Sequence, residues 1–306
     1  MKNDATKVAV LMAVKNGIDY LPQQIDSILN QKQCEIALIV SDDFSTDGSA
    51  EFLHKYATEK SNLTVLPRTV SFGSAAKNFY RLIMEADMDG FDFFAFSDQD
   101  DLWLPDKLTR HTQLAREHHA DGVSSNVVAF WPDGRERLLD KAQPQRELDY
   151  LFESAGPGCT YLMTPWLFDK LRAQLLEENS RAKETALHDW LAYAVCRAYG
   201  HKWIIDNQPT VKYRQHQTNV FGANVGLSAK WARLQKLKQH WYRNEVIKIA
   251  KVCHKISTHP GIETLIGLLE NKDRSSRIKL FFYAAKARRK MLDRFLLAFA
   301  LLTGLF

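Results

Sequence analysis

Three carboxylates lie within four residues at Asp98, Asp100 and Asp101, directly after the apolar run Phe91–Phe96. Like charges so close together repel one another unless a positive group compensates them. Divalent cations prefer carboxylate oxygens, and protein sites commonly combine one or two carboxylates with the phosphates of a substrate. The spacing therefore predicts a metal site that serves phosphate chemistry, and the alternative is a solvated acidic turn ahead of a helix.

A second acid pair, Asp42 and Asp43, follows the apolar run Ile36–Val40. A carboxylate at this point can accept a hydrogen bond from the imide N–H of a uracil or thymine ring. The alternative is an Asx-type cap for the helix that follows. Both acid clusters come at the ends of predicted strands, which is where open α/β sheets bind their ligands.

The elements that must position these acids alternate between strand and helix over the first hundred residues. Continuous apolar runs predict buried strands, and apolar residues at helical spacing predict the helices between them. Such alternation is typical of βαβ units and of a mainly parallel sheet. The predicted strands cover 8–14, 36–40, 63–66 and 91–96, and the predicted helices cover 20–30, 48–59 and 74–86. The segment 121–227 mixes short strands with a helix at about 183–198, and the chain from about 228 onward is predicted to be helical.

Composition and charge narrow the class of protein. Hydrophobic residues make up 45% and charged residues 25% of the 306, which excludes a disordered chain or a collagen-like repeat. The four cysteines show no C-x-x-C pair and no zinc spacing, so we expect reduced thiols in the cytosol; the N-terminus shows no secretory signal. From Ser228 to the end, 17 Lys and Arg face five acids, a net charge of +12 against +5 for the whole chain. Such a tail is expected to have its own partner: nucleic acid, an anionic membrane surface or an anionic substrate.

Three sequence blocks extend the acid clusters into a longer ordered pattern. They are Val8-Ala-Val-Leu-Met-Ala-Val-Lys-Asn-Gly17, Ser41-Asp-Asp-Phe-Ser-Thr-Asp-Gly-Ser49 and Ser97-Asp-Gln-Asp-Asp-Leu-Trp-Leu-Pro-Asp-Lys-Leu108. Together they resemble the family-two glycosyltransferases, nucleotide-sugar enzymes with the GT-A fold. The third block is most similar to the branch that contains bacterial rhamnosyltransferases of surface polysaccharides. The resemblance covers about residues 7–225, and it implies an α/β GT-A domain at 1–227, with a mainly parallel sheet flanked by helices, followed by a basic helical region at 228–306.

The resemblance also implies roles for individual residues. The base would be read by Asp43, with Asp42, and the ribose by Asp98; the nucleotide site as a whole would comprise Ala13, Val14, Asn16, Asp42, Asp43, Lys77, Asp98 and Gln99. A Mg²⁺ or Mn²⁺ ion would be held by Asp100 and His216, with Arg214 at the diphosphate. The donor sugar and the acceptor would lie against Trp103, Gly158, Cys159 and Trp190.

Asp189 is the candidate general base. An acceptor hydroxyl must lose its proton as it attacks the anomeric carbon, and a positioned carboxylate can take that proton. In the family a carboxylate at this point is normally preceded by another acid, whereas this chain has His188. The alternative is an ordinary helix N-terminal carboxylate, favoured by the helix dipole.

The sequence therefore predicts an inverting, metal-dependent glycosyltransferase that moves L-rhamnose from dTDP-L-rhamnose onto a hydroxyl of a polysaccharide or lipopolysaccharide acceptor. The alternatives are a transferase of the same fold with a UDP-hexose donor, a sugar nucleotidyltransferase, and a nucleic-acid-binding protein that uses the basic tail. Nucleic acid is not the expected partner, because the acidic strand ends would repel its phosphates.

The C-terminal segment 277–306 joins a basic cluster at 286–290 to an uncharged run at 295–306. Twelve apolar residues are too few to cross a bilayer, which needs about 20. A basic segment beside an apolar one is typical of a helix in the headgroup region of an anionic membrane. We therefore expect a cytoplasmic enzyme held peripherally on the inner face of the cytoplasmic membrane, with a lipid-linked or oligosaccharide acceptor. The alternative is a terminal helix docked on its own domain.

Overall fold

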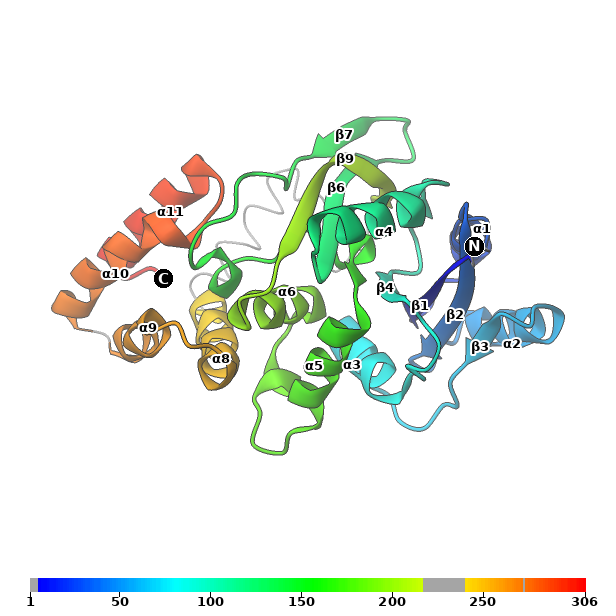
Figure 1. Ribbon diagram of the computed structural model, residues 1–306, viewed down its shortest axis with the longest axis horizontal. Helices are drawn as coiled ribbons and strands as arrows, with labels where there is room; N and C mark the ends of the chain where they lie inside the picture. The colour runs from blue at the N-terminus through cyan, green and yellow to red at the C-terminus, as the bar shows by residue number, and fades with distance from the viewer. Residues whose placement is uncertain (1–4, 217–239, 272) are drawn as a thin grey trace.

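The computed structural model describes residues 5–216, 240–271 and 273–306. Within these ranges a nine-stranded sheet runs through the molecule in the order β3-β2-β1-β4-β8-β6-β9-β5, and β7 pairs with β6. Helices cover the sheet, and a group of C-terminal helices forms the end of the molecule away from β3 (Figure 1). The sheet with its helices is the α/β arrangement that the sequence predicted.

The N-terminal half of the sheet is parallel, as the alternation of strands and helices predicted. β1 (Thr6–Val14) lies between β2 (Cys34–Asp42) and β4 (Phe93–Ser97), and β2 also pairs with β3 (Leu63–Val65). The connections are made by α1 (Leu21–Leu29), α2 (Ser49–Glu59) and α3 (Ala75–Glu85). Each of these elements begins and ends within three residues of its predicted range.

Both faces of β1 are buried, because helices cover both sides of the sheet. Val8 and Met12 belong to one apolar cluster, which includes residues of α1 and α4, and Leu11 belongs to the other, with residues of α3, α5 and α6. This alternation is the period of two expected for a strand. The helices named here span Lys107–His118 (α4), Pro165–Leu176 (α5) and His188–Ala198 (α6).

The C-terminal half of the sheet is mixed, so the prediction of a mainly parallel sheet is correct only for the first four strands. Its members are β5 (Leu102–Trp103), β6 (Gly122–Phe130), β7 (Glu136–Leu139), β8 (Leu162–Met163) and β9 (Trp203–Arg214). β8 is antiparallel to β4 and β6, whereas β9 is parallel to β6 and antiparallel to β5. β5 and β8 are two residues long, and such short strands carry no periodicity from which pairing could be predicted.

The helix predicted at 183–198 is divided in the structure. A short 3-10 helix at Ala182–Glu184 ends before α6 begins at His188. The Thr185 hydroxyl donates a hydrogen bond to the Ala182 carbonyl, and Leu187 is extended, with φ of −134°. The break separates Asp189 from the preceding turn and places it in the first turn of α6.

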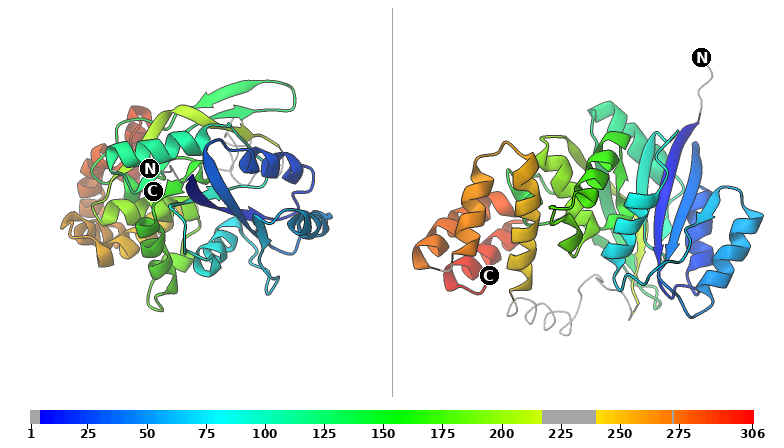
Figure 2. Two further views of the ribbon diagram at one scale, coloured as in Figure 1. Left: turned by 45° about the vertical axis from the view of Figure 1, so that its right-hand side comes forward. Right: turned by 90° about the horizontal axis from the view of Figure 1, so that it is seen from below.

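Four C-terminal helices follow the sheet: α8 (Trp241–Ile256), α9 (Gly261–Glu270), α10 (Arg274–Ala287) and α11 (Met291–Thr303). They lie together at one end of the molecule, with α8 nearest the sheet (Figure 2). Residues of α8, such as Ile249, share one apolar cluster with α6 and with Leu297 of α11. The described part of the C-terminal region is therefore packed against the sheet domain. The expected boundary at 227/228 lies outside the described residues.

No described helix has the length and apolar content to span a membrane. All four cysteines are free thiols, as their spacing predicted.

Candidate active site

The two acid clusters meet at one edge of the sheet. In the parallel register of β1 and β2, Val14 is opposite Asp42, and β4 ends with Ser97 opposite Met12. The turn that begins at Asp98 therefore lies beside the β1 end and the Asp42–Asp43 pair. Ala13 and Val14 are buried in β1, so any contact with a ligand would use their backbone.

Gln99 fixes the turn that follows β1. Its Oε1 accepts a hydrogen bond from the Lys15 amide at 2.8 Å, and its Nε2 donates to the Lys15 carbonyl at 3.0 Å. A Cβ at Gly17 would lie 2.5 Å from Gln99 Oε1, so a larger residue there would displace the Gln99 amide from its hydrogen bonds to Lys15. Asn16 holds the neighbouring loop in the same way, because its Oδ1 accepts from the Thr46 amide at 2.8 Å. Gln99 and Asn16 thus shape the predicted nucleotide site through protein contacts.

The Asp42 and Asp43 carboxylates are almost fully buried and already have protein partners. Asp43 accepts hydrogen bonds from the amides of Phe72 and Gly73, at 2.6 and 3.0 Å. Asp42 forms an ion pair with Arg68. Among the described residues, Asp42 Oδ1 has no hydrogen-bond donor. Of the two predicted base readers, Asp42 therefore retains the free buried acceptor, and Asp43 anchors the loop before α3.

Asp100 meets the end of β9. Its Oδ2 lies 2.7 Å from Nε2 of His216, whose ring stacks on Tyr20 with 4.9 Å between ring centroids. The Arg214 Nε donates to the Asp100 carbonyl at 2.8 Å, and the Arg214 amide donates to Asp101 at 3.0 Å. The structure therefore brings together the three residues predicted at the metal and the diphosphate, although 116 residues separate Asp100 from His216.

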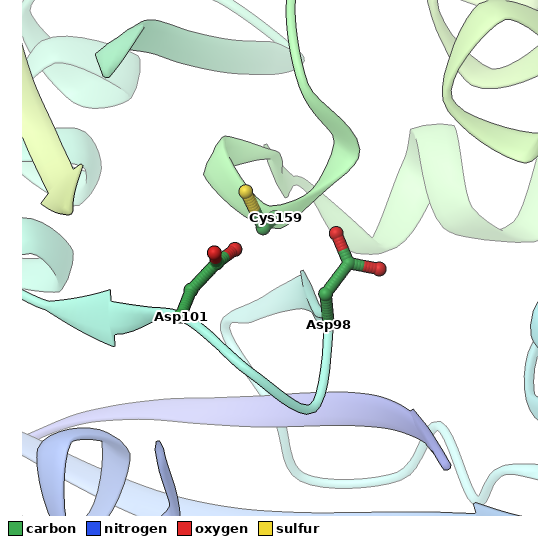
Figure 3. Close-up of side chains that lie close together, drawn as sticks. All are labelled: Asp98, Asp101 and Cys159. Atoms are coloured by element: carbon green, nitrogen blue, oxygen red, sulfur yellow. The ribbon is translucent and has the colours of Figure 1, made fainter. Parts of the chain in front are cut away.

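Asp98, Asp101 and Cys159 form a compact group, with one ligand-type atom of each within 4.8 Å of the others (Figure 3). Burial, together with the charges of Asp100 and Asp189, raises the pKa of Asp98 to about 7. Burial raises the pKa of Asp101 well above its usual range. Burial also raises the pKa of the Cys159 thiol, which hydrogen-bonds to Asp101. A cysteine that binds a metal must be a thiolate, and Mg²⁺ prefers oxygen ligands. These three side chains therefore suit a role in supporting the acidic turn better than a metal site.

Three residues expected at the sugar or acceptor belong to the core. Cys159 is buried and hydrogen-bonds to Asp101. Trp190 donates its indole N–H to the Tyr150 carbonyl at 2.8 Å. Trp103 is 4% exposed and packs on Lys107, whose Nζ lies 3.5 Å from the ring centroid. Burial lowers the pKa of Lys107 to about 7. The three side chains are thus packed in the protein interior in this structure, and their contact with the sugar or the acceptor stays a prediction.

Asp189 lies at the site, in the first turn of α6. Its carboxylate accepts a hydrogen bond from the Trp190 amide at 2.7 Å. Burial raises its pKa to about 6, against the opposing effects of backbone hydrogen bonds and of Lys141. Its charge contributes to the raised pKa of Asp98, so the predicted base lies within electrostatic range of the acidic turn.

At the position before Asp189, where the family resemblance implies another acid, this chain has the neutral side chain of His188. Its ring stacks on Phe79 with 3.7 Å between centroids and meets Phe96 edge-on at 5.1 Å. Burial lowers the pKa of His188 to about 3. The residue therefore adds no charge next to Asp189, and it positions the start of α6 by packing.

Gly158→Ala is expected to lower both the melting temperature and kcat. The added Cβ would lie 2.8 Å from His188 Nε2 and 3.2 Å from Asp189 Cβ, and the aromatic stack prevents His188 from moving away. Overpacking of this kind costs about 1–3 kcal/mol of the free energy of unfolding. The control is Gly267→Ala inside α9. An added Cβ there would have no described atom within 4 Å apart from the nearby backbone of its own helix, and we expect a stabilisation of about 1 kcal/mol. Wild-type melting and turnover in Gly158→Ala would show that this contact does not constrain the site.

Lys77 lies exposed in the first turn of α3 and lines a cavity of about 540 Å³. The other wall includes Lys183 and the segment Glu184–Ala186, which leads into α6. The cavity thus has two cationic side chains and lies next to the loop that Asp43 anchors. Glu184 adds a carboxylate to the same wall, and the diphosphate contact of Lys77 stays a prediction.

The sequence reasoning missed Tyr20, Gln24 and Arg68. Gln24 donates from Nε2 to the Ser97 hydroxyl at 2.8 Å, directly before the acidic turn. Tyr20 stacks on His216, and Arg68 neutralises Asp42. No residue pattern marks these three, because each acquires its role only through contacts between distant segments.

This site, built from acidic strand ends and a carboxylate on a helix, is that of a GT-A nucleotide-sugar transferase. Residues 9–170 match the profile of Glycosyl transferase family 2, and the chain belongs to this family. It is therefore a glycosyltransferase, which excludes the nucleic-acid-binding and nucleotidyltransferase alternatives as its principal function.

The chain is 36% identical over 296 residues to the dTDP-rhamnosyl transferase RfbG of Shigella flexneri, covering 96% of this chain and 100% of RfbG. The fold is similar to the crystal structure of S. aureus TarS 1-349, with a TM-score of 0.59 and 14% identity over 98% of this chain and 81% of that one. It is also similar to the mannosyltransferase PcManGT from Pyrobaculum calidifontis, solved with GDP-Man and Mn²⁺, with a TM-score of 0.55 and 15% identity over 99% and 82% of the chains.

Proposed function

We propose that the protein transfers L-rhamnose from dTDP-L-rhamnose to a hydroxyl of a polysaccharide or lipopolysaccharide acceptor, with inversion at the anomeric carbon. The observation that carries the proposal is the single site formed by Asp189 and the Asp98–Asp101 turn. The donor is supported by the likeness to RfbG, which extends over the whole of that relative.

The chain's own groups account for the transfer in one displacement. Asp189 accepts the proton of the acceptor hydroxyl as its oxygen bonds to the anomeric carbon, and the bond from that carbon to the diphosphate oxygen breaks. The nucleotide diphosphate leaves with the bonding electron pair, and the cationic side chains of Arg214 and Lys77 would balance its charge. One-step displacement from the opposite side inverts the configuration.

A divalent cation fits the Asp100–His216 pair. The carboxylate oxygen and the imidazole nitrogen are 2.7 Å apart, close to the roughly 3 Å that separates adjacent ligands around an octahedral ion with bonds of about 2.1 Å. Oxygen and imidazole donors suit Mn²⁺, and oxygen donors suit Mg²⁺. Asp100 and His216 would hold such an ion, which would supply positive charge to the departing diphosphate.

Nucleotide selectivity tests the donor assignment. We expect dTDP with Mn²⁺ to raise the melting temperature more than UDP or GDP with Mn²⁺ at the same concentration, because the nucleotide with the lowest Kd stabilises the fold most. A ligand at 100 times its Kd adds about 2.7 kcal/mol to the free energy of unfolding. Each nucleotide without Mn²⁺ is the matched control and should give a smaller shift. Stronger stabilisation by UDP would indicate the UDP-hexose alternative, and no response to any nucleotide would contradict the proposed function.

The acceptor and the place of action complete the proposal. We propose a lipid-linked or oligosaccharide acceptor and a peripheral location on the inner face of the cytoplasmic membrane. The support is the large share of exposed apolar side chains in the C-terminal helices: nine of thirteen among the described residues lie between Ile278 and Leu305.

A further inference from the structure

The outward face of α11 carries no charge. Its exposed large side chains recur at helical spacing and are 46–68% exposed: Met291, Leu292, Phe295, Leu296, Phe299 and Leu302. The opposite face, with Leu297 and Leu301, is buried in the protein core. α11 is therefore docked on its own domain on one side and leaves an unbroken apolar stripe on the other.

The neighbouring α10 adds apolar and basic side chains. Ile278 and Phe282 are exposed, and Phe282 is 69% exposed. The exposed charged residues of the two helices and their caps are Arg274, Lys279, Lys286 and Lys290, against Asp273 at the α10 N-cap. The apolar stripe thus lies beside a nearly uniform positive charge.

The basic cluster at 286–290 is only partly available for a partner, which corrects the sequence-based expectation. Arg289 is buried and paired with Asp149 and Glu153. Arg288 pairs with Asp293 at 3.0 Å and donates to the Phe152 carbonyl at 3.1 Å. These two arginines bind the α10–α11 hairpin to the sheet domain, and Lys286 pairs with Glu147 at 2.9 Å. Lys279 on α10 and Lys290 at the α11 N-cap are exposed basic side chains of the hairpin.

We infer that the outer face of the α10–α11 hairpin is a docking surface for an anionic lipid bilayer. An anionic bilayer matches both features, since its acyl region accepts apolar side chains and its headgroups attract Lys and Arg. A second copy of the chain would match only the apolar stripe and would bring two positive surfaces together. α11 has 13 residues, so at 1.5 Å per residue it is about 20 Å long and lies along the membrane surface. The inference deepens the proposed membrane location and rests on it.

Vesicle flotation of the full chain tests the surface. Wild-type protein should float with phosphatidylglycerol-containing vesicles at low salt, and binding should weaken with salt and with phosphatidylcholine alone. Phe295→Ser combined with Phe299→Ser should reduce binding at least about tenfold. The control is Val70→Ser combined with Leu176→Ser, which removes apolar side chains that are also more than half exposed elsewhere and should bind like wild type.

Charge variants test the electrostatic part. Lys279→Glu combined with Lys290→Glu should reduce binding to anionic vesicles at least about tenfold. Lys55→Glu combined with Lys60→Glu, at α2 near the opposite end of the molecule (Figure 1), should not. Stabilisation by dTDP with Mn²⁺ should remain at the wild-type value in every variant, which shows that the fold and the nucleotide site are intact.

Three results would overturn the inference. The first is wild-type protein that ignores anionic vesicles at low salt, and the second is a serine variant that floats as wild type does. The third is a wild-type dimer that the serine variant converts to monomer while vesicles remain unbound, which would assign the stripe to a second copy. In each case an unchanged nucleotide response would leave the proposed transferase function standing.

Discussion

Asp189→Asn is expected to lower kcat by at least about 10²-fold while the affinity for dTDP stays within a few-fold of wild type. The amide keeps the shape of the carboxylate in the first turn of α6 but cannot accept the acceptor's proton. The control is Asp169→Asn, an exposed acid on α5 that should turn over normally. An equal loss of dTDP affinity would contradict the role of a base and indicate a structural or metal-binding role.

The pH dependence of wild-type kcat examines the same residue. Since burial raises the pKa of Asp189 to about 6, the basic form is lost as the pH falls through about 6, and kcat should fall with it.

The same shift of the Asp189 pKa has the opposite effect on the stability of the fold. The folded state holds this proton more tightly than the unfolded state, whose pKa is near 3.8, so this group's contribution to the free energy of unfolding declines as pH rises from about 4 to about 6.

Asp100→Ala is expected to abolish the Mn²⁺-dependent part of the dTDP stabilisation and nearly all transfer, with the protein still folded. Its carboxylate lies 2.7 Å from His216 in the proposed metal site, and we do not expect the two neighbouring acids to replace it. Asp101 is engaged by the Arg214 amide, and Asp98 is partly protonated near neutral pH because its pKa is about 7. His216→Ala should weaken the metal response in the same direction.

The control for Asp100→Ala is Asp106→Ala, an exposed acid just before α4 that makes no side-chain cap. It should retain both the metal response and the turnover. An Asp100→Ala protein with wild-type turnover and unchanged sensitivity to EDTA would refute the metal assignment.

The first half of the fold could be predicted because its elements are locally encoded. Runs such as 8–14 are continuous and apolar, since helices bury both faces of a parallel sheet, and the acids directly after them mark the strand ends. The pairing of Asp100 with His216 was reached only through the family resemblance, because no local pattern links residues so far apart in the chain.

The remaining differences have one physical origin. A sequence pattern does not tell whether a tryptophan or cysteine next to a catalytic acid faces a ligand or the core, and Trp103, Cys159 and Trp190 face the core. In the same way, Arg288 and Arg289 appear as free charge in the sequence, but they are neutralised by acids about 140 residues away. For Cys159, Trp190 and Arg289 the partner comes from a distant segment: Asp101, the Tyr150 carbonyl and Asp149.

A transfer assay tests whether the protein is an inverting rhamnosyltransferase. Purified protein is incubated with Mn²⁺ and either dTDP-L-rhamnose or UDP-glucose, with a lipid-linked oligosaccharide acceptor, and the product is analysed by mass spectrometry and NMR. We predict that rhamnose is transferred from dTDP-L-rhamnose, that dTDP is released, and that the anomeric configuration of the new linkage is opposite to that of the donor. Transfer from UDP-glucose alone, or a product with retained configuration, would contradict it.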